Sequence, residues 1–167
     1  MIIDISPIVK TEGAALDIDI NTTLEGLNTL DEGFIFDKPV YFTGTAVNTG
    51  GILKLTGKLH TVYRVKCYRC LKDIDAEIST TIKEDIFNSE KNPDAEAYTY
   101  EGNKLTPDKI LYDNIVLNLP LRQSCSESCS GFCANCGVNL NTGICECKED
   151  FINPQLAVLK DFFKADT

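Results

Sequence analysis

Residues 52–83 read ILKLTGKLHTVYRVKCYRCLKDIDAEISTTIK, and the expected fold follows from this stretch. In its first half, apolar side chains occupy mostly odd positions and polar side chains mostly even positions, which is typical of a strand with one buried face. The polar face carries Lys54, Lys58, His60, Arg64 and Lys66. The second half alternates in the same way around Ile74, Ala76, Ile78 and Ile82. The stretch therefore predicts a long antiparallel hairpin with Cys67 and Cys70 at its tip.

The sequence on either side of this hairpin predicts shorter elements. Alternation predicts strands at residues 14–20 and around residues 34–42, and a short strand at residues 98–100. Thr106 is expected to cap a helix that spans residues 107–119, and Asn153 a last helix that begins at Pro154. Within the hairpin, Gly57 predicts a β-bulge.

These elements predict an α+β fold, in which a mostly antiparallel β-sheet carries a few helices and a C-terminal Cys-rich zinc module. The chain has 167 residues, 43% of them hydrophobic and 25% charged, so it can bury a core without covalent staples. We expect residues 1–120 to form the sheet domain with its packing helix. We expect residues 121–167 to form the zinc module and a C-terminal helix, packed on that domain as one compact unit.

The composition argues against several classes of function. A net charge of −9 argues against a protein that coats nucleic acid or a membrane surface. The sequence has no apolar run of the roughly 18 residues that a membrane span needs, and its first ten residues lack the pattern of a signal peptide. We therefore expect a cytoplasmic protein with no membrane partner. No acid, base and nucleophile form a recognisable motif, and His60 is expected to be a surface strand residue, so we expect neither an enzyme nor a small-molecule substrate.

The eight cysteines are the strongest functional signal in the sequence. They form one pair and one cluster of six, namely Cys67, Cys70, Cys125, Cys129, Cys133, Cys136, Cys145 and Cys147. Disulfides are rare in a reducing compartment, whereas tight Cys-x-x-Cys spacing suits a metal knuckle. Because His60 is the single histidine, a zinc site must consist of thiolates. Structural zinc takes four ligands, so eight thiolates predict two Zn²⁺ sites.

Two groupings of the cysteines are compatible with their spacing. In the preferred grouping, the first pair shares an ion with Cys125 and Cys129, and the last four cysteines close a local site. In the alternative grouping, the first pair meets Cys133 and Cys136. The spacing of residues 129–136 also matches the iron–sulfur motif of radical S-adenosylmethionine enzymes, but only 31 residues follow, too few for their barrel. A closed four-thiolate site leaves no position for a substrate, so the zinc is expected to be structural.

Several motifs together resemble a known family. They are Cys67-Tyr-Arg-Cys70-Leu71 on the hairpin, Leu119-Pro120-Leu121 after the helix, the six-cysteine cluster with Gly131 and Gly137, and Asn153-Pro154. This pattern resembles the bacterial YceD-type family of large ribosomal RNA subunit accumulation proteins, in its Gram-positive-like branch with a second cysteine cluster. The resemblance covers roughly residues 1–163 and is most specific over residues 119–159. It implies a non-enzymatic role in the accumulation of large-subunit (23S) rRNA, and hence in ribosome biogenesis.

The basic strand of the hairpin provides candidate contacts to RNA. Residues 38–72 contain seven lysines and arginines and no acidic residue. The candidate contact residues are Lys54, Lys58, Arg64, Lys66, Tyr68 and Arg69. The alternative explanation is that these cations pair across the hairpin with Asp73, Asp75 and Glu77.

The expected partner of such a protein is large-subunit rRNA or a ribosomal protein. Two zinc ions with eight thiolates would change the net charge of −9 to −13. This charge repels phosphate, so any RNA contact must be focal, and a basic protein fits the overall field better. The alternative function is a thiol- or zinc-responsive regulatory protein, in which labile thiolates are themselves the sensor.

Overall fold

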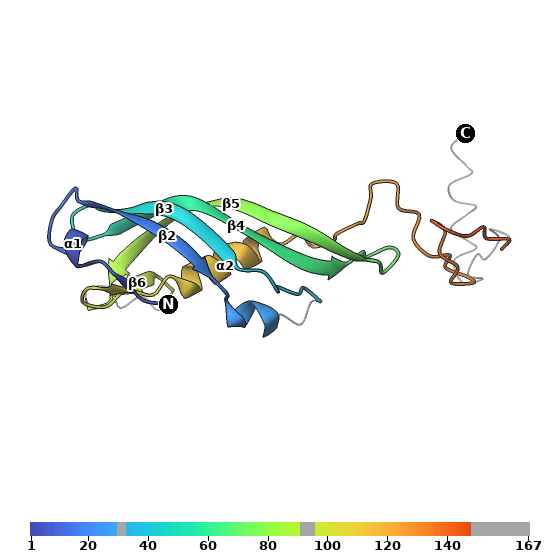
Figure 1. The fold of residues 1–167 in the computed structure, drawn as a ribbon, viewed down its shortest axis with the longest axis horizontal. Helices are drawn as coiled ribbons and strands as arrows, with labels where there is room; N and C mark the ends of the chain where they lie inside the picture. The colour runs from blue at the N-terminus through green and yellow to red at the C-terminus, as the bar shows by residue number, and fades with distance from the viewer. Residues whose placement is uncertain (30–32, 91–95, 148–167) are drawn as a thin grey trace, which may run out of the picture.

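A five-stranded β-sheet in the order β2-β3-β4-β5-β6 forms the body of the protein in the computed structural model, which describes residues 1–29, 33–90 and 96–147 (Figure 1). The strands are β2 (Ala15–Thr22), β3 (Val40–Asn48), β4 (Leu53–Lys66), β5 (Asp73–Asn88) and β6 (Tyr98–Tyr100). The first four strands pair antiparallel, and β6 pairs parallel to β5. A second sheet pairs β1 (Ile3–Asp4) with β7 (Lys104–Leu105). The expected α+β fold with a mostly antiparallel sheet is confirmed.

The hydrophobic core lies between one face of the large sheet and the helix α2 (Asp108–Asn118), which crosses that face (Figure 1). The short helix α1 (Ser6–Val9) and the 3-10 helix η1 (Glu25–Thr29) complete the helical elements of the described residues, and they add Ile8 and Leu27 to the core. The side chains that β4, β5 and α2 bury include Leu53, Leu55, Leu59, Tyr63, Val65, Ile78, Ile82, Ile86, Ile110, Leu111 and Ile115. The parity of residues 52–83 thus predicted the buried face correctly.

The hairpin β4–β5 has an unbroken register, so the β-bulge predicted at Gly57 is wrong. Pairing runs without a shift from Leu53 opposite Ile86 to Lys66 opposite Asp73. The glycine serves packing instead, because a Cβ atom at Gly57 would lie 2.5 Å from Cζ of the Phe42 ring. The missing side chain makes room for a buried aromatic ring.

Replacing this glycine tests that explanation. Gly57→Ala is expected to lower the free energy of unfolding by about 1–3 kcal/mol, because the added methyl group overpacks the core against Phe42. Chemical denaturation measures the change. Gly26→Ala is the control, because its added methyl group would meet the Tyr112 ring at an ordinary 3.6 Å. Equal stability of the two variants would contradict the packing role of Gly57.

The helix predicted at residues 107–119 is α2, but Thr106 does not cap it. Pro107 occupies the N-cap position, and no side chain caps the helix there. Asp108 lies in the first turn, where a negative charge is favourable, and it pairs with the N-terminal ammonium group of Met1. A charge in the first turn therefore replaces the hydroxyl cap that we expected from Thr106.

The strand predicted around residues 34–42 begins only at Val40. Ahead of it, Ile35 forms an isolated bridge with Arg64, with reciprocal backbone N–H···O bonds of 2.8 Å. This bridge leaves Phe34 and Phe36 buried against Tyr63, with ring centroids 5.5 and 5.7 Å apart. The short strand predicted at residues 98–100 is confirmed as β6.

Residues 121–129 run beside the tip of the hairpin and contact it, and residues 130–147 lie beyond the tip, at one end of an elongated molecule (Figure 1). They contain turns and one isolated bridge, between Phe132 and Asn139. The helix predicted from Asn153 and Pro154 falls outside the described residues, so its packing on the sheet domain stays a prediction. Among the residues that the structure describes, no helix is both long and apolar enough to cross a membrane.

Candidate metal centres

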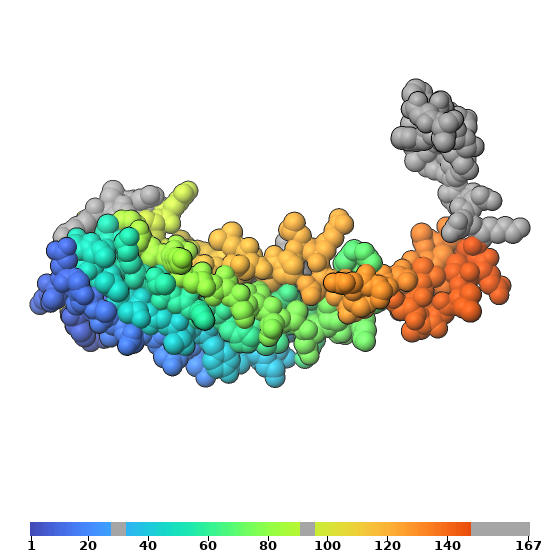
Figure 2. All heavy atoms as spheres, turned by 90° about the horizontal axis from the view of Figure 1, so that it is seen from above, coloured from blue at the N-terminus to red at the C-terminus, as the bar shows by residue number. Residues whose placement is uncertain are grey.

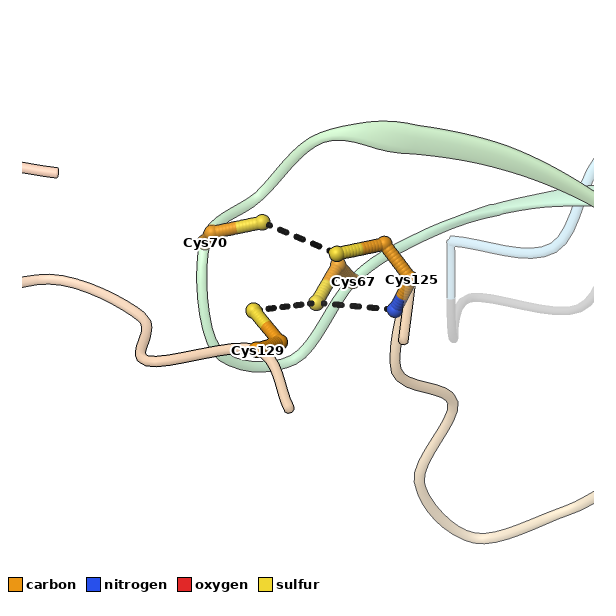
Figure 3. A group of neighbouring side chains, drawn as sticks. All are labelled: Cys67, Cys70, Cys125 and Cys129. Atoms are coloured by element: carbon orange, nitrogen blue, oxygen red, sulfur yellow. Dashed lines mark hydrogen bonds between the residues drawn. The ribbon is translucent and has the colours of Figure 1, made fainter. Parts of the chain in front are cut away.

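Four cysteine sulfurs meet at the tip of the hairpin and form the inner group (Figure 3). They belong to Cys67, Cys70, Cys125 and Cys129, and all lie within 4.8 Å of one another. The Sγ atoms of Cys67 and Cys129 are 3.9 Å apart, and those of Cys70 and Cys125 are 3.6 Å apart. A tetrahedron with zinc–sulfur bonds of about 2.3 Å separates its sulfurs by about 3.8 Å. The inner group therefore matches a closed four-thiolate site.

The other four cysteines form an outer group in the segment that follows. Its members are Cys133, Cys136, Cys145 and Cys147, again within 4.8 Å of one another. Sγ of Cys145 lies 3.3 Å from Sγ of Cys133 and 3.6 Å from Sγ of Cys136. The two groups differ in burial, because Cys67 is 0% exposed whereas Cys136 and Cys147 are exposed. The structure thus assembles the preferred grouping of the cysteines rather than the alternative.

The two Cys-x-x-Cys turns have the same backbone geometry. In the first, Cys67 N–H donates to Lys72 O at 2.8 Å and Leu71 N–H donates to Cys67 O at 2.9 Å. In the second, Cys133 N–H donates to Val138 O at 2.8 Å and Gly137 N–H donates to Cys133 O at 2.9 Å. The residue after the second cysteine is left-handed in both turns, with φ of 55° at Leu71 and 72° at Gly137. Each turn presents its two sulfurs to one point.

Backbone N–H groups in these turns stabilise thiolates. Burial acts to raise the pKa of Cys67, but hydrogen bonds from the backbone of Cys70, Cys125 and Arg69 outweigh it and lower the pKa to about 6. Hydrogen bonds from the backbone N–H groups of Cys136 and Asn135 likewise lower the pKa of Cys133 to about 6. Each group therefore contains one cysteine with a lowered pKa, which favours the thiolate form that binds metal.

The remaining thiols show why each group needs a cation. Hydrogen bonds shared with the sulfurs of Cys129 and Cys70, together with burial, raise the pKa of Cys125 to about 12. The sulfurs of Cys145 and Cys136 do the same for Cys147, whose pKa is raised to about 12. Four thiolates at this separation repel one another, and a divalent ion supplies the compensating charge. The donor set, which is all sulfur and tetrahedral in spacing, fits zinc.

The side chain of Asn141 links the two groups, a role that was not predicted from the sequence. Asn141 donates from Nδ2 to Cys129 Sγ at 3.5 Å, while its Oδ1 accepts from the Ser130 backbone at 2.9 Å. Leu140 N–H also donates to Gly131 O at 2.8 Å. The loop of the outer group therefore packs against a ligand of the inner group. No role was predicted for Asn141, because its contact depends on a turn that brings positions twelve residues apart together.

Of the four basic residues of β4, Lys54 and Arg64 pair with acids, whereas Lys58 is exposed and forms no ion pair with any described residue, and Lys66 lies at the tip. Arg64 pairs with Asp75 at 3.0 Å and with Asp37 at 3.4 Å, and Lys54 lies 4.0 Å from Asp85. Of the three acids proposed as cross-strand partners, only Asp75 forms an ion pair within the described residues. His60 is a surface residue whose Nδ1 lies 2.9 Å from Ser79 Oγ.

Four cations gather at the tip around an exposed tyrosine. Arg69 and Arg122 place Cζ at 5.3 and 5.8 Å from the centroid of the Tyr68 ring, which is 44% exposed. Lys66 and Lys72 flank them and are exposed. We call Lys66, Tyr68, Arg69, Lys72 and Arg122 the tip patch. Within the described residues, none of its four cations forms an ion pair. Arg122 is 53 positions past Arg69, so only the fold brings it here.

Two hydrogen bonds to backbone carbonyl groups, one from a side chain and one from the backbone, hold the tip patch against the inner group. Arg69 Nη1 donates to Cys129 O at 2.7 Å, and Tyr68 N–H donates to Gln123 O at 3.0 Å. Arg69 also donates from Nε to the Tyr68 hydroxyl at 2.7 Å. The two chain segments that supply the inner sulfurs are therefore also the segments that supply the tip patch.

Comparison with known proteins places this arrangement in a family. Residues 55–163 match the family model described as large ribosomal RNA subunit accumulation protein YceD, so the chain belongs to that family. It is similar to the Zea mays protein named "Large ribosomal RNA subunit accumulation protein YCED homolog 1, chloroplastic", with 28% identity over 159 residues. The match covers 75% of this chain and 54% of the maize protein, so the chain spans about half the length of that relative. No solved structure matches the chain.

The left-handed residues of the two turns provide a paired test of the turn geometry. A left-handed backbone costs a non-glycine residue about 1–2 kcal/mol. Leu71→Gly should therefore strengthen metal binding by the inner group, and Gly137→Ala should weaken binding by the outer group, each by about fivefold for about 1 kcal/mol. Space is not limiting at Gly137, because nothing lies within 4 Å of an added Cβ. Chelator competition measures both affinities, and effects of the same sign would contradict the shared geometry.

Proposed function

We propose that this protein is a non-enzymatic, zinc-binding ribosome-biogenesis factor that supports the accumulation of large-subunit (23S) rRNA through a focal contact with that RNA. The observation that carries the proposal is the tip patch, a cluster of unpaired cations around Tyr68 that is built on a four-sulfur group. Membership of the YceD family and the name of the maize relative support the choice of RNA.

The zinc in this proposal has a structural role. Two sites of four thiolates each would leave no open coordination position, which a catalytic zinc requires. Zinc in the inner group would instead join the hairpin tip to residues that follow α2, across 55 or more positions of sequence. Structural zinc supplies on the order of 10 kcal/mol of apparent binding energy, which is enough to hold such a junction.

The proposed RNA contact lies at the tip patch rather than along the strand face. Arg64 and Lys54 already interact with carboxylates, so their binding to phosphate would require breaking ion pairs. The tip patch presents arginine, lysine and an aromatic ring in one place, and these groups contact phosphates and stack on bases. A tip fixed by metal also loses little conformational entropy when it binds.

The exposed outer group supports a second candidate function, that of a zinc- or thiol-responsive regulator. Cys136 and Cys147 are exposed, whereas Cys67, Cys70 and Cys129 are buried. Exposed thiolates are the ones that oxidants reach. Rapid zinc loss and disulfide formation in mild peroxide, with loss of rRNA association, would favour the regulator over a purely structural outer group.

Zinc content is the first test. We expect two zinc ions per chain after purification under reducing conditions, because the sulfurs form two groups of four. Elemental analysis measures the stoichiometry. A chelator should remove the ion of the outer group faster than the ion of the inner group, because the outer group is more exposed. A value near zero, or a brown iron chromophore, would contradict the proposal.

Single cysteine substitutions test which ion holds which region. Cys70→Ser should remove one ion and increase hydrogen exchange both at residues 67–72 and at residues 121–131, because the inner group joins these segments. Cys136→Ser is the matched variant, and its effect should stay within residues 130–147. An exchange increase confined to residues 67–72 in the first variant would show that the inner group does not bridge the two segments.

Charge reversal tests the RNA contact. The triple variant Lys66→Glu, Lys72→Glu, Arg122→Glu should bind a large-subunit rRNA precursor transcript at least tenfold more weakly, with zinc content unchanged. Each lost phosphate contact should reduce the salt slope by about 0.7, so three contacts reduce it by about 2. The control Lys10→Glu, Lys54→Glu, Lys58→Glu has the same net charge change away from the tip. An equal loss in the control would refute the assignment to the tip patch, and absence of RNA binding by the unmodified protein would point to a ribosomal protein instead.

A further inference from the structure

The outer edge of β5 is an unused pairing surface. Strand β4 pairs with one side of β5 from Asp73 to Ile86, but β6 pairs with the other side only at residues 86–88. Among the described residues, no strand lies against the outer edge between Asp73 and Asp85. Such an edge presents a row of backbone N–H and C=O groups that another strand can pair with.

Two hollows open along this edge. The first, of about 500 Å³, lies between β5 and the linker after α2, and its lining includes Glu77, Ile78 and Pro120. The second, of about 640 Å³, lies near the start of β6, and its lining includes Glu84 and Ala97. Glu77 and Glu84 are seven residues apart, or about 23 Å along a strand. In Figure 2 the yellow-green band of β5 runs along the molecule beside the orange residues of α2 and the linker.

The outer edge of β5 is acidic, so it favours a strand that carries positive charge. Residues 73–85 contain five acidic residues and one lysine. Asp75 and Asp85 interact with cations of β4, whereas Asp73 and Glu77 form no ion pair with any described residue. A second copy of the chain would place these carboxylates against each other, and an RNA strand would add phosphates to them, so both are repelled.

We propose that the outer edge of β5 is a docking site for an extended basic segment of another protein, which adds to the sheet as a further strand. Backbone hydrogen bonds to the edge would supply affinity, and the two hollows would receive side chains about seven residues apart along the segment. The acids of β5 would select lysine and arginine on the face of that segment beside them. This surface adjoins the tip patch at Asp73 but shares no residue with it, and the proposal does not depend on RNA binding.

The experiment uses the full-length, zinc-loaded protein and a fluorescein-labelled peptide of eight alternating lysines and valines. We expect anisotropy to show saturable binding, and hydrogen exchange to show new protection of backbone amides between residues 73 and 85. Asp73→Lys with Glu77→Lys should weaken binding at least tenfold. The matched control is Asp17→Lys with Asp19→Lys, which makes the same charge change on the other edge strand, β2. This control should change the affinity less than threefold.

A second peptide separates strand pairing from simple charge attraction. The same sequence with every backbone nitrogen methylated keeps its charge but cannot donate backbone hydrogen bonds, so it should bind at least tenfold more weakly. Equal binding of the methylated peptide, or an equal loss in the β2 control, would overturn the proposal. So would protection of the same amides by a single-stranded RNA oligonucleotide but not by the peptide, because that result would assign the edge to RNA.

Discussion

The tip of the hairpin depends on sulfur rather than on hydrophobic packing. The main core reaches Val65 on β4 and Ile74 on β5, and beyond it the buried cluster consists of Cys67, Cys70 and Cys129. Four thiolates would repel one another here, and the sulfurs around Cys125, together with burial, accordingly raise its pKa to about 12. A divalent cation converts this repulsion into attraction. The positions of Tyr68, Arg69 and the segment after α2 all follow from that one junction.

The two sulfur groups share a backbone design but differ in their surroundings. The inner group joins segments that are far apart in sequence and is shielded from solvent, whereas the outer group closes within fifteen residues and is open to it. Loss of an ion from the inner group would therefore separate two parts of the fold, and loss from the outer group would release only a local loop. Asn141 couples them, because its amide contacts a ligand of the inner group from the loop of the outer one.

Local patterns predicted what depends on neighbours in sequence. The parity of residues 52–83 predicted the hairpin and its buried face, whereas the spacing of the cysteines left two groupings open, of which the structure shows the preferred one. Features that depend on distant residues were missed or misread. Gly57 accommodates Phe42 from another strand, Arg64 takes Asp37 as a second partner, and Arg122 returns to Tyr68 after a helix. Thr106 does not cap α2 because the helix begins one residue later than predicted, with Pro107 at the N-cap position.

The length of β4 also separates charges in space. The register places Asp19 of β2 level with Thr43 and Lys58, eight residues before Lys66. At about 3.3 Å per residue, Asp19 therefore lies about 26 Å from Lys66 at the base of the tip. The Debye length at physiological salt is about 8 Å, so more than three screening lengths lie between them. A polyanion that meets the tip would therefore sense the charges near the tip with little contribution from the acidic residues of β2, because the length of the hairpin separates the two.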